Sequence, residues 1–132
     1  MSSGAMNILV VDDDSANIVS IKVVLKSMGH TVEVLKDGAD ALTRLTEQPD
    51  HYHILITDHA MCNVSGQELL AQLKSTAFKG RIIVLSGYMT LELEAKYREL
   101  GADKIIRKPF DLDEMRNAVE ELRSLPASNT AQ

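Results

Sequence analysis

The sequence predicts an α/β fold in which a five-stranded parallel sheet is doubly wound, with helices covering both of its faces. Two observations lead to this expectation. Short apolar runs alternate five times with longer stretches of helical spacing, which is the pattern of a (βα)5 chain. The chain has 132 residues, of which 45% are hydrophobic and 25% are charged, and this size and composition are typical of one globular domain.

The apolar runs are the expected strands, and they occupy residues 8–11, 31–35, 54–57, 81–85 and 104–107. The first, third and fourth runs are almost wholly apolar, as in strands that are buried on both faces. The second run alternates and the fifth has a charge at each end, which is typical of edge strands. With these two at the edges, right-handed crossovers give the strand order 2-1-3-4-5. This order is flavodoxin-like, and such folds bind ligands at the carboxyl ends of their strands.

A stretch of helical spacing follows each expected strand. After the first strand, Ile18, Ile21 and Leu25 recur at intervals of three and four residues, and Gly29 is expected to end the helix. After the fifth strand, Asp111 is expected to cap the amino end of the last helix. The apolar stripe of that helix consists of Leu112, Met115, Val119 and Leu122.

Charge and composition narrow the possible functions. Fourteen basic and nineteen acidic residues give a net charge of −5, which repels phosphate backbones, so we expect no direct nucleic-acid partner. Cys62 is the only cysteine, which excludes an intrachain disulfide and fits a reducing compartment. No apolar run exceeds four residues, so we expect no membrane segment. These features together favour a cytoplasmic protein.

A single domain is expected over residues 6–125. Residues 1–5 are interpreted as the remnant of an expression tag and are excluded from the argument about the fold. Residues 126–132 begin with a proline and are otherwise small or polar, so we expect a flexible tail or the start of a linker.

Chemically active side chains follow four of the expected strands. Asp12, Asp13 and Asp14 follow the first strand, and Asp58 follows the third. Ser86 and Gly87 follow the fourth strand, and Lys108 and Pro109 follow the fifth. Each of these features alone is often a solvated turn or a helix cap. Because the carboxyl ends of parallel strands meet at one edge, the combination favours a functional site.

The expected cluster has a specific chemistry. Two carboxylates about 4 Å apart repel each other by roughly 4 kcal/mol at an effective dielectric constant of 20, so Asp12, Asp13 and Asp58 should not gather unaided. A hard divalent cation removes this conflict, and Mg²⁺ is the usual choice for oxygen ligands that also receive a phosphoryl oxygen. Lys108 and the Ser86 hydroxyl can contact the same anion. A carboxylate, a metal, a lysine and a hydroxyl together indicate an aspartyl-phosphate site.

These residues resemble the motifs of response-regulator receiver domains in two-component signalling, and the chemotaxis-regulator type in particular. The resemblance covers residues 6–125. The motifs that carry it are Ile8-Leu-Val-Val-Asp-Asp-Asp14, Ile54-Leu-Ile-Thr-Asp58, Met61 with Gly66, Ile82-Ile-Val-Leu-Ser-Gly87 and Lys108-Pro-Phe110.

The resemblance implies a role for each site residue. Asp58 would be the phosphoacceptor, and Ser86 and Lys108 would contact the phosphoryl group. The implied Mg²⁺ ligands are Asp12, Asp13, Asp58 and the main-chain carbonyl of Ala60. The phosphodonor would be a histidine kinase or a histidine phosphotransfer protein, and the output partner is not specified. The domain would be a monomer or a phosphorylation-dependent dimer, and would promote its own phosphorylation and dephosphorylation without multiple turnover on external substrates.

The sequence departs from the family pattern near the site. Cys62 stands where proline is usual, and Ile105 stands where many members carry an aromatic ring, so the familiar switch between a hydroxyl and an aromatic ring is in question. Ala60 and Tyr88 would flank the path of a hydrolytic water. The Tyr88 ring would either cover this path or point outward as part of a partner surface.

Two alternatives use the same carboxylates. A haloacid-dehalogenase-type phosphatase would use Asp12 and Asp14, but Ala16 stands where Thr or Val is expected and Asp58 would have no role. A degenerate receiver, never phosphorylated and acting only as an interaction module, would lack at least one of Asp13, Asp58 and Lys108, and all three are present.

Two other functions, FMN binding and metal binding by histidine and cysteine, are less well supported by the sequence. A flavodoxin-like FMN carrier would need a phosphate-binding first loop, where this chain has three carboxylates. A metal site of histidine and cysteine would draw on His51, His53, His59 and Cys62. The expected third strand separates these residues into two pairs, so solvated surface histidines are the favoured interpretation.

Overall fold

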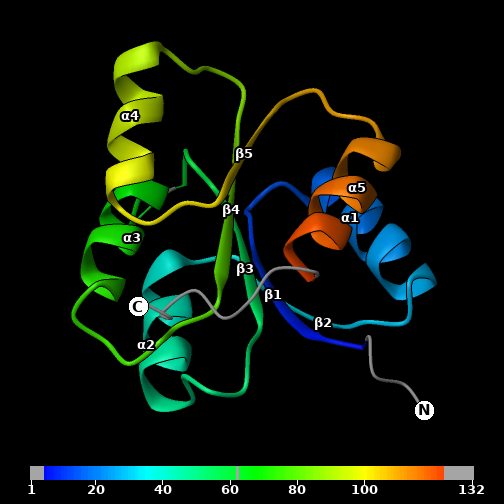
Figure 1. Cartoon of the computed structure of the whole chain (residues 1–132), viewed down its shortest axis with the longest axis horizontal. Coiled ribbons are helices and arrows are strands. Elements are labelled where there is room, and N and C mark those ends of the chain that lie inside the picture. Colours follow the sequence, from blue (N-terminus) through cyan, green and yellow to red (C-terminus); the bar gives the residue numbers. More distant parts are fainter. Residues whose placement is uncertain (1–4, 62, 124–132) are drawn as a thin grey trace.

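The computed structural model describes residues 5–61 and 63–123, which form a sheet between two layers of helices (Figure 1). The strands are β1 (Asn7–Val11), β2 (Thr31–Leu35), β3 (Ile54–Asp58), β4 (Arg81–Ser86) and β5 (Lys104–Arg107). The helices are α1 (Ser15–Ser27), α2 (Gly38–Glu47), α3 (Gly66–Leu73), α4 (Leu91–Glu99) and α5 (Leu112–Arg123). The expected alternation of strands and helices is confirmed.

The five strands form one parallel sheet in the order β2-β1-β3-β4-β5, as predicted. The strands that are apolar throughout lie in the middle, and β2 and β5 lie at the edges. Strands β3 and β4 each extend one residue further than expected, so that Asp58 and Ser86 are the last residues of their strands. Both side chains are therefore fixed by the sheet rather than carried by a loop.

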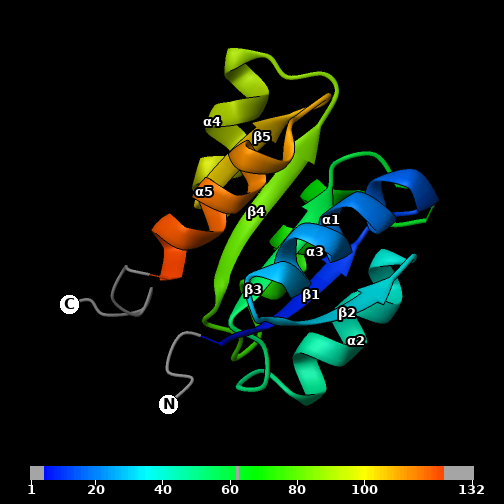
Figure 2. The same cartoon turned by 90° about the vertical axis from the view of Figure 1, so that its right-hand side faces the viewer.

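The sheet separates two hydrophobic cores. Helices α1 and α5 cover one face, and α2, α3 and α4 cover the other (Figures 1 and 2). Successive residues of β1 alternate between the faces: Ile8 and Val10 pack under α1 and α5, and Leu9 and Val11 pack under the other layer. This alternation explains why the central strands are apolar throughout, since both of their faces are covered.

The expected helix ends are confirmed at two positions. Helix α1 ends in a cap at Met28, and the next residue, Gly29, has a φ of 92°, a left-handed conformation that glycine adopts without strain. At the other end of the chain, the Asp111 carboxylate accepts a hydrogen bond of 2.7 Å from the Glu114 N–H and so caps α5.

Some expectations concern residues that the structure does not describe. Residues 1–4, 62 and 124–132 lie outside the described part of the chain. Most of the expected tag remnant (1–5) and all of the expected tail (126–132) are among these residues. The boundaries at residues 6 and 125 therefore stay predictions. Among the described residues, no helix has both the length and the apolar character needed to cross a membrane.

His30 is buried between α1 and β2, with only 6% of its surface exposed. Its Nδ1 accepts a hydrogen bond of 3.1 Å from the Met6 N–H, so the proton of the neutral ring lies on Nε2. Within the described part of the chain, Nε2 is buried and has no hydrogen-bond partner. Burial lowers the pKa of His30, and the charge of Arg123 lowers it further.

We predict that His30 makes the fold less stable as the pH falls. Below about pH 6.5 the unfolded chain takes up a proton at this histidine and the folded chain does not, so the free energy of unfolding decreases by at most about 1.4 kcal/mol per pH unit. His30→Asn keeps an acceptor near the Nδ1 position but cannot titrate. Chemical denaturation between pH 7.5 and pH 5.5 should therefore show a larger loss of stability in the wild type than in the variant. Parallel losses in the two proteins would contradict this role.

Candidate functional site

Three carboxylates meet at the carboxyl ends of β1 and β3. Val11 pairs with Thr57 in the sheet, so the next residues, Asp12 and Asp58, lie side by side. Asp13 joins them, and one carboxylate oxygen from each of the three lies within 4.8 Å of the others. Asp12 and Asp58 are buried and Asp13 is exposed, so the cluster opens to solvent on one side. The structure thus brings together three of the residues predicted from the sequence.

Lys108 contacts this cluster from the end of β5. Its Nζ lies 3.0 Å from Oδ1 of Asp58 and 3.9 Å from Oδ2 of Asp12. The main chain holds the lysine in place, because the Lys108 N–H donates a hydrogen bond of 2.8 Å to the Ser86 carbonyl. Lys108 therefore contacts two of the three carboxylates of the cluster, those of Asp12 and Asp58.

Burial is the main influence on the ionisation of Asp12. Burial raises the pKa of Asp12 above its ordinary value, a hydrogen bond from the Asp14 N–H opposes the shift, and the neighbouring charge of Asp58 adds to it. Asp14 itself has a different task. Its carboxylate accepts a hydrogen bond of 2.9 Å from the Ala16 N–H and caps α1. The acidic triplet therefore divides into two cluster residues and one helix cap.

Ser86 ends β4 on the other side of Asp58 and is almost fully buried. Its Oγ accepts a hydrogen bond of 3.1 Å from the Tyr88 N–H and donates one to the Tyr88 carbonyl. The hydroxyl is thus engaged with the segment that leads into α4. The Tyr88 ring is 71% exposed, so it points outward, which agrees with the second of the two orientations considered from the sequence.

His59 is a residue whose part in the site the sequence did not reveal. His51 and His53 are exposed, as expected of surface histidines, but His59 is half-buried. Its Nδ1 is hydrogen-bonded to the hydroxyl of Tyr97, which is fully buried in α4. Burial, and to a lesser extent the charge of Asp58, raises the pKa of Tyr97, so the phenol stays protonated. For His59, the expectation of a solvated surface histidine is therefore wrong.

Three other positions that the sequence analysis singled out are Ala60, Cys62 and Ile105. Ala60 is exposed in the turn that follows β3, and the role of its carbonyl as a metal ligand stays a prediction. Cys62 lies outside the described residues. Ile105 is half-buried, packs against the core beneath α4, and lines a groove of about 470 Å³ beside that helix.

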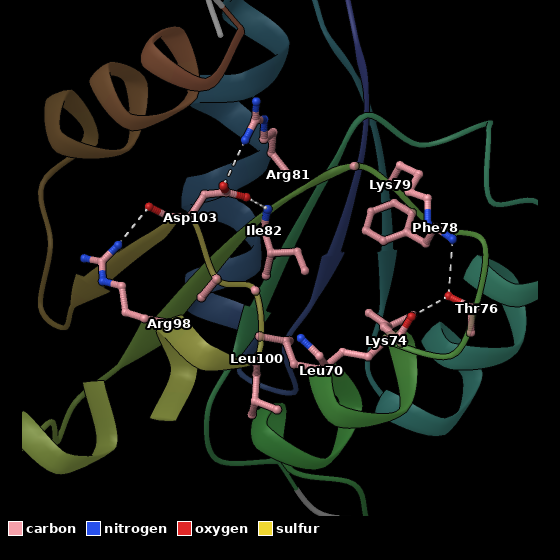
Figure 3. A pocket seen from close by; sticks show the side chains of 14 residues that line it. Leu70, Lys74, Thr76, Phe78, Lys79, Arg81, Ile82, Arg98, Leu100 and Asp103 are labelled. Atoms are coloured by element: carbon pink, nitrogen blue, oxygen red, sulfur yellow. Dashed lines mark hydrogen bonds and ion pairs between the residues drawn. The ribbon is translucent and has the colours of Figure 1, made fainter. Parts of the chain in front are cut away.

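A separate cavity of about 460 Å³ lies at the opposite end of the sheet (Figure 3). It opens between the segment that joins α3 to β4 and the turn that joins α4 to β5. Asp103 there accepts hydrogen bonds from Arg81, at 3.1 Å, and from the Ile82 N–H, at 2.9 Å. This cavity lies at the amino ends of β4 and β5 and shares no residue with the carboxylate cluster.

Comparisons with known proteins identify the family of this chain. The family described as the response regulator receiver domain matches residues 8–120. Response regulator MprA of Mycobacterium ulcerans is 36% identical over 84% of this chain and 47% of its own length. Cell cycle response regulator CtrA of Brucella ovis is 34% identical over 83% of this chain and 47% of its own length. The chain therefore spans about half the length of these curated relatives.

Solved structures show the same fold. A CheY-like response regulator receiver domain protein from Methanospirillum hungatei is 26% identical, covers 90% of this chain and 94% of its own, and has a TM-score of 0.82. The receiver domain of the sensor histidine kinase PA1611 from Pseudomonas aeruginosa, solved with a magnesium ion in its active-site cleft, is 20% identical. It covers 92% of this chain and 99% of its own, with a TM-score of 0.81.

The family match favours a receiver over the haloacid-dehalogenase-type phosphatase, for which the comparisons give no support. It agrees with the sequence motifs and with the order of the strands. The chain belongs to the response regulator receiver domain family of two-component signalling.

Proposed function

We propose that Asp58 accepts a phosphoryl group from the phosphohistidine of a histidine kinase or of a histidine phosphotransfer protein. The observation that carries this proposal is the position of Asp58 at the end of β3. Its carboxylate is 3.0 Å from Lys108 and is grouped with those of Asp12 and Asp13. In the transfer, an oxygen of Asp58 attacks phosphorus, the bond from phosphorus to the donor imidazole breaks, and an acyl phosphate forms.

Mg²⁺ fits the carboxylate cluster. Asp12 is fully buried among like charges, which is a costly arrangement for an ionised carboxylate unless a cation balances it. Asp12, Asp13 and Asp58 would hold the ion, with the carbonyl of Ala60 as a further oxygen ligand. A bound Mg²⁺ would neutralise negative charge on the phosphoryl oxygens during transfer. The magnesium in the active-site cleft of the Pseudomonas receiver supports this assignment.

Lys108 and Ser86 would position the transferred group from two sides. Lys108 already pairs with Asp58, and its ammonium group can remain beside the new phosphoryl oxygens as a counter-charge. The Ser86 hydroxyl would exchange its bond to the Tyr88 carbonyl for a bond to the phosphoryl group. This exchange would release the start of the segment before α4, and so would change the surface formed by α4, β5 and α5.

The proposed role is that of a signalling domain and not that of an enzyme with multiple turnover on external substrates. Phosphorylation replaces the −1 charge of the Asp58 carboxylate with a phosphoryl group that carries about −1.5 to −2 charges. This change shifts the population of the α4, β5 and α5 surface toward the form that a partner recognises. The chain would promote its own phosphorylation and dephosphorylation, act in the cytoplasm, and exist as a monomer or as a phosphorylation-dependent dimer. Direct binding of nucleic acid by this domain is not expected, because its net charge is −5.

We predict that acetyl phosphate and Mg²⁺ add one phosphoryl group to the wild type and none to Asp58→Asn. Intact-mass spectrometry measures the addition directly. Asp37→Asn is the matched control, because it removes a carboxylate from the cap of α2, where asparagine also caps well. This control should be phosphorylated like the wild type. Equal phosphorylation of Asp58→Asn would show that another residue is the acceptor.

We predict that Asp13→Ala weakens Mg²⁺ binding by more than about tenfold, because the site loses an anionic ligand. Calorimetric titration of Mg²⁺ into the metal-free protein gives the dissociation constant. The same variant should melt at a higher temperature than the wild type without metal, because the repulsion on Asp12 and Asp58 is lower. A metal-free variant that is clearly less stable than the wild type would count against repulsion within the cluster.

A further inference from the structure

We propose that the hydrogen bond between His59 and Tyr97 couples helix α4 to the phosphoacceptor, so that the two residues position α4 in response to the state of Asp58. This inference rests on the proposed phosphorylation of Asp58 and adds the route by which that event reaches α4. The route consists of the main chain from Asp58 to His59, the imidazole of His59, and the phenol of Tyr97.

Tyr97 is the main anchor of α4 to the body of the domain. It is the one fully buried residue of this helix, and it belongs to the core on the α2, α3 and α4 face. Leu93 is partly buried on the same side, and most of the remaining residues of α4 are exposed. Since few apolar contacts hold α4, its position depends strongly on the partners of Tyr97.

The Tyr97 hydroxyl lies against the main chain that follows Asp58. Its partner is Nδ1 of His59, and the two rings meet edge to face, with centroids 5.5 Å apart at an angle of 83°. Gly66 makes this close approach possible. A Cβ at Gly66 would lie 3.0 Å from the Tyr97 hydroxyl and 2.6 Å from the Asp58 carbonyl oxygen. The hydroxyl, His59 and Asp58 therefore form one tightly packed group.

The main chain of His59 is held on both sides, so its side chain moves with the strand that carries Asp58. The His59 N–H donates a hydrogen bond of 2.8 Å to the Leu85 carbonyl, and the His59 carbonyl accepts one of 2.9 Å from the Gly66 N–H. A phosphoryl group on Asp58 acts on the residue directly before this fixed peptide. A shift of the Asp58 main chain would move the whole His59 peptide, because its hydrogen bonds limit independent rotation, and would carry the imidazole and the hydroxyl end of Tyr97 with it.

This route reaches a different part of α4 from the one that Ser86 reaches. Ser86 contacts Tyr88, which precedes the helix, whereas Tyr97 lies in the last turn. Ile105 lies beneath the same helix but has no polar atom in its side chain and cannot exchange a hydrogen bond with the site. A polar link from the site to the carboxyl end of α4 therefore runs through His59 and Tyr97.

Hydrogen exchange of residues 91–99 tests the coupling, measured with and without beryllofluoride and Mg²⁺, which mimic the phosphoryl group. We expect exchange in this segment to change about fivefold or more in the wild type, and this change to be largely lost in Tyr97→Phe, which removes only the hydroxyl. Tyr52→Phe is the matched control, because it removes the hydroxyl of another buried tyrosine, whose partners Glu33 and Arg44 belong to β2 and α2. The control should respond like the wild type. An undiminished response in Tyr97→Phe would overturn the proposal.

Variants of His59 distinguish coupling from a purely structural role. His59→Leu should lose the response as Tyr97→Phe does, and His59→Asn, which keeps a polar group near the Nδ1 position, should retain most of it. The double variant Tyr97→Phe with His59→Leu should lose no more than either single variant, because both changes break one interaction. Additive losses, or no rescue by His59→Asn, would show that the pair does not act as a unit.

Phosphorylation of every variant by acetyl phosphate is measured by intact mass in the same experiment. If the wild type takes up no phosphoryl group, the proposed function fails and the coupling fails with it. If the wild type and Tyr97→Phe are both phosphorylated and their α4 responses are equal, only the coupling fails.

Discussion

The repulsion among Asp12, Asp13 and Asp58 is the constraint on which the rest of the molecule depends. Two of these carboxylates are buried, and a single lysine contacts them, so the site is costly to hold together in the folded protein. The apolar strands offset that cost. Strands β1, β3 and β4 bury nearly every side chain, and the rigid sheet leaves Asp12 and Asp58 no freedom to separate. The cluster is therefore ready for a cation before any cation binds.

The same sheet divides the domain into a rigid part and a part that can respond. Helix α1 and helix α5 each bury several side chains against one face, whereas α4 fully buries Tyr97 alone. A change at Asp58 therefore meets the least resistance on the side of α4. The weak attachment of α4 is a property of that helix and not of its layer, because α2 and α3 on the same face bury three and four residues.

The fold could be predicted from the sequence because burial determines it. The apolar runs predict the strands. The alternating pattern of 31–35 and the charged ends of 104–107 predict the two edge strands of the sheet. The convergence of Asp12, Asp13, Asp58 and Lys108 followed from strand order alone. The contact between His59 and Tyr97 could not be predicted from strand order, because the direction of a side chain in a turn depends on its packing against residues distant in the sequence. One signal was nevertheless present: Leu93 and Tyr97 lie four residues apart in a helix whose other residues are mostly charged, and Leu100 follows three residues later.

The two polar links from the site explain how a receiver can respond without an aromatic side chain at position 105. Ser86 contacts the segment before α4, and His59 contacts Tyr97 in the last turn. A helix that is linked at both ends to one site, and that buries little between them, moves as a unit when either link changes. An aromatic ring in the strand beneath α4 would add a third contact. In this chain that position holds Ile105, whose apolar contacts only support the helix. The response of α4 then depends on hydrogen bonds that begin at the residues next to Asp58.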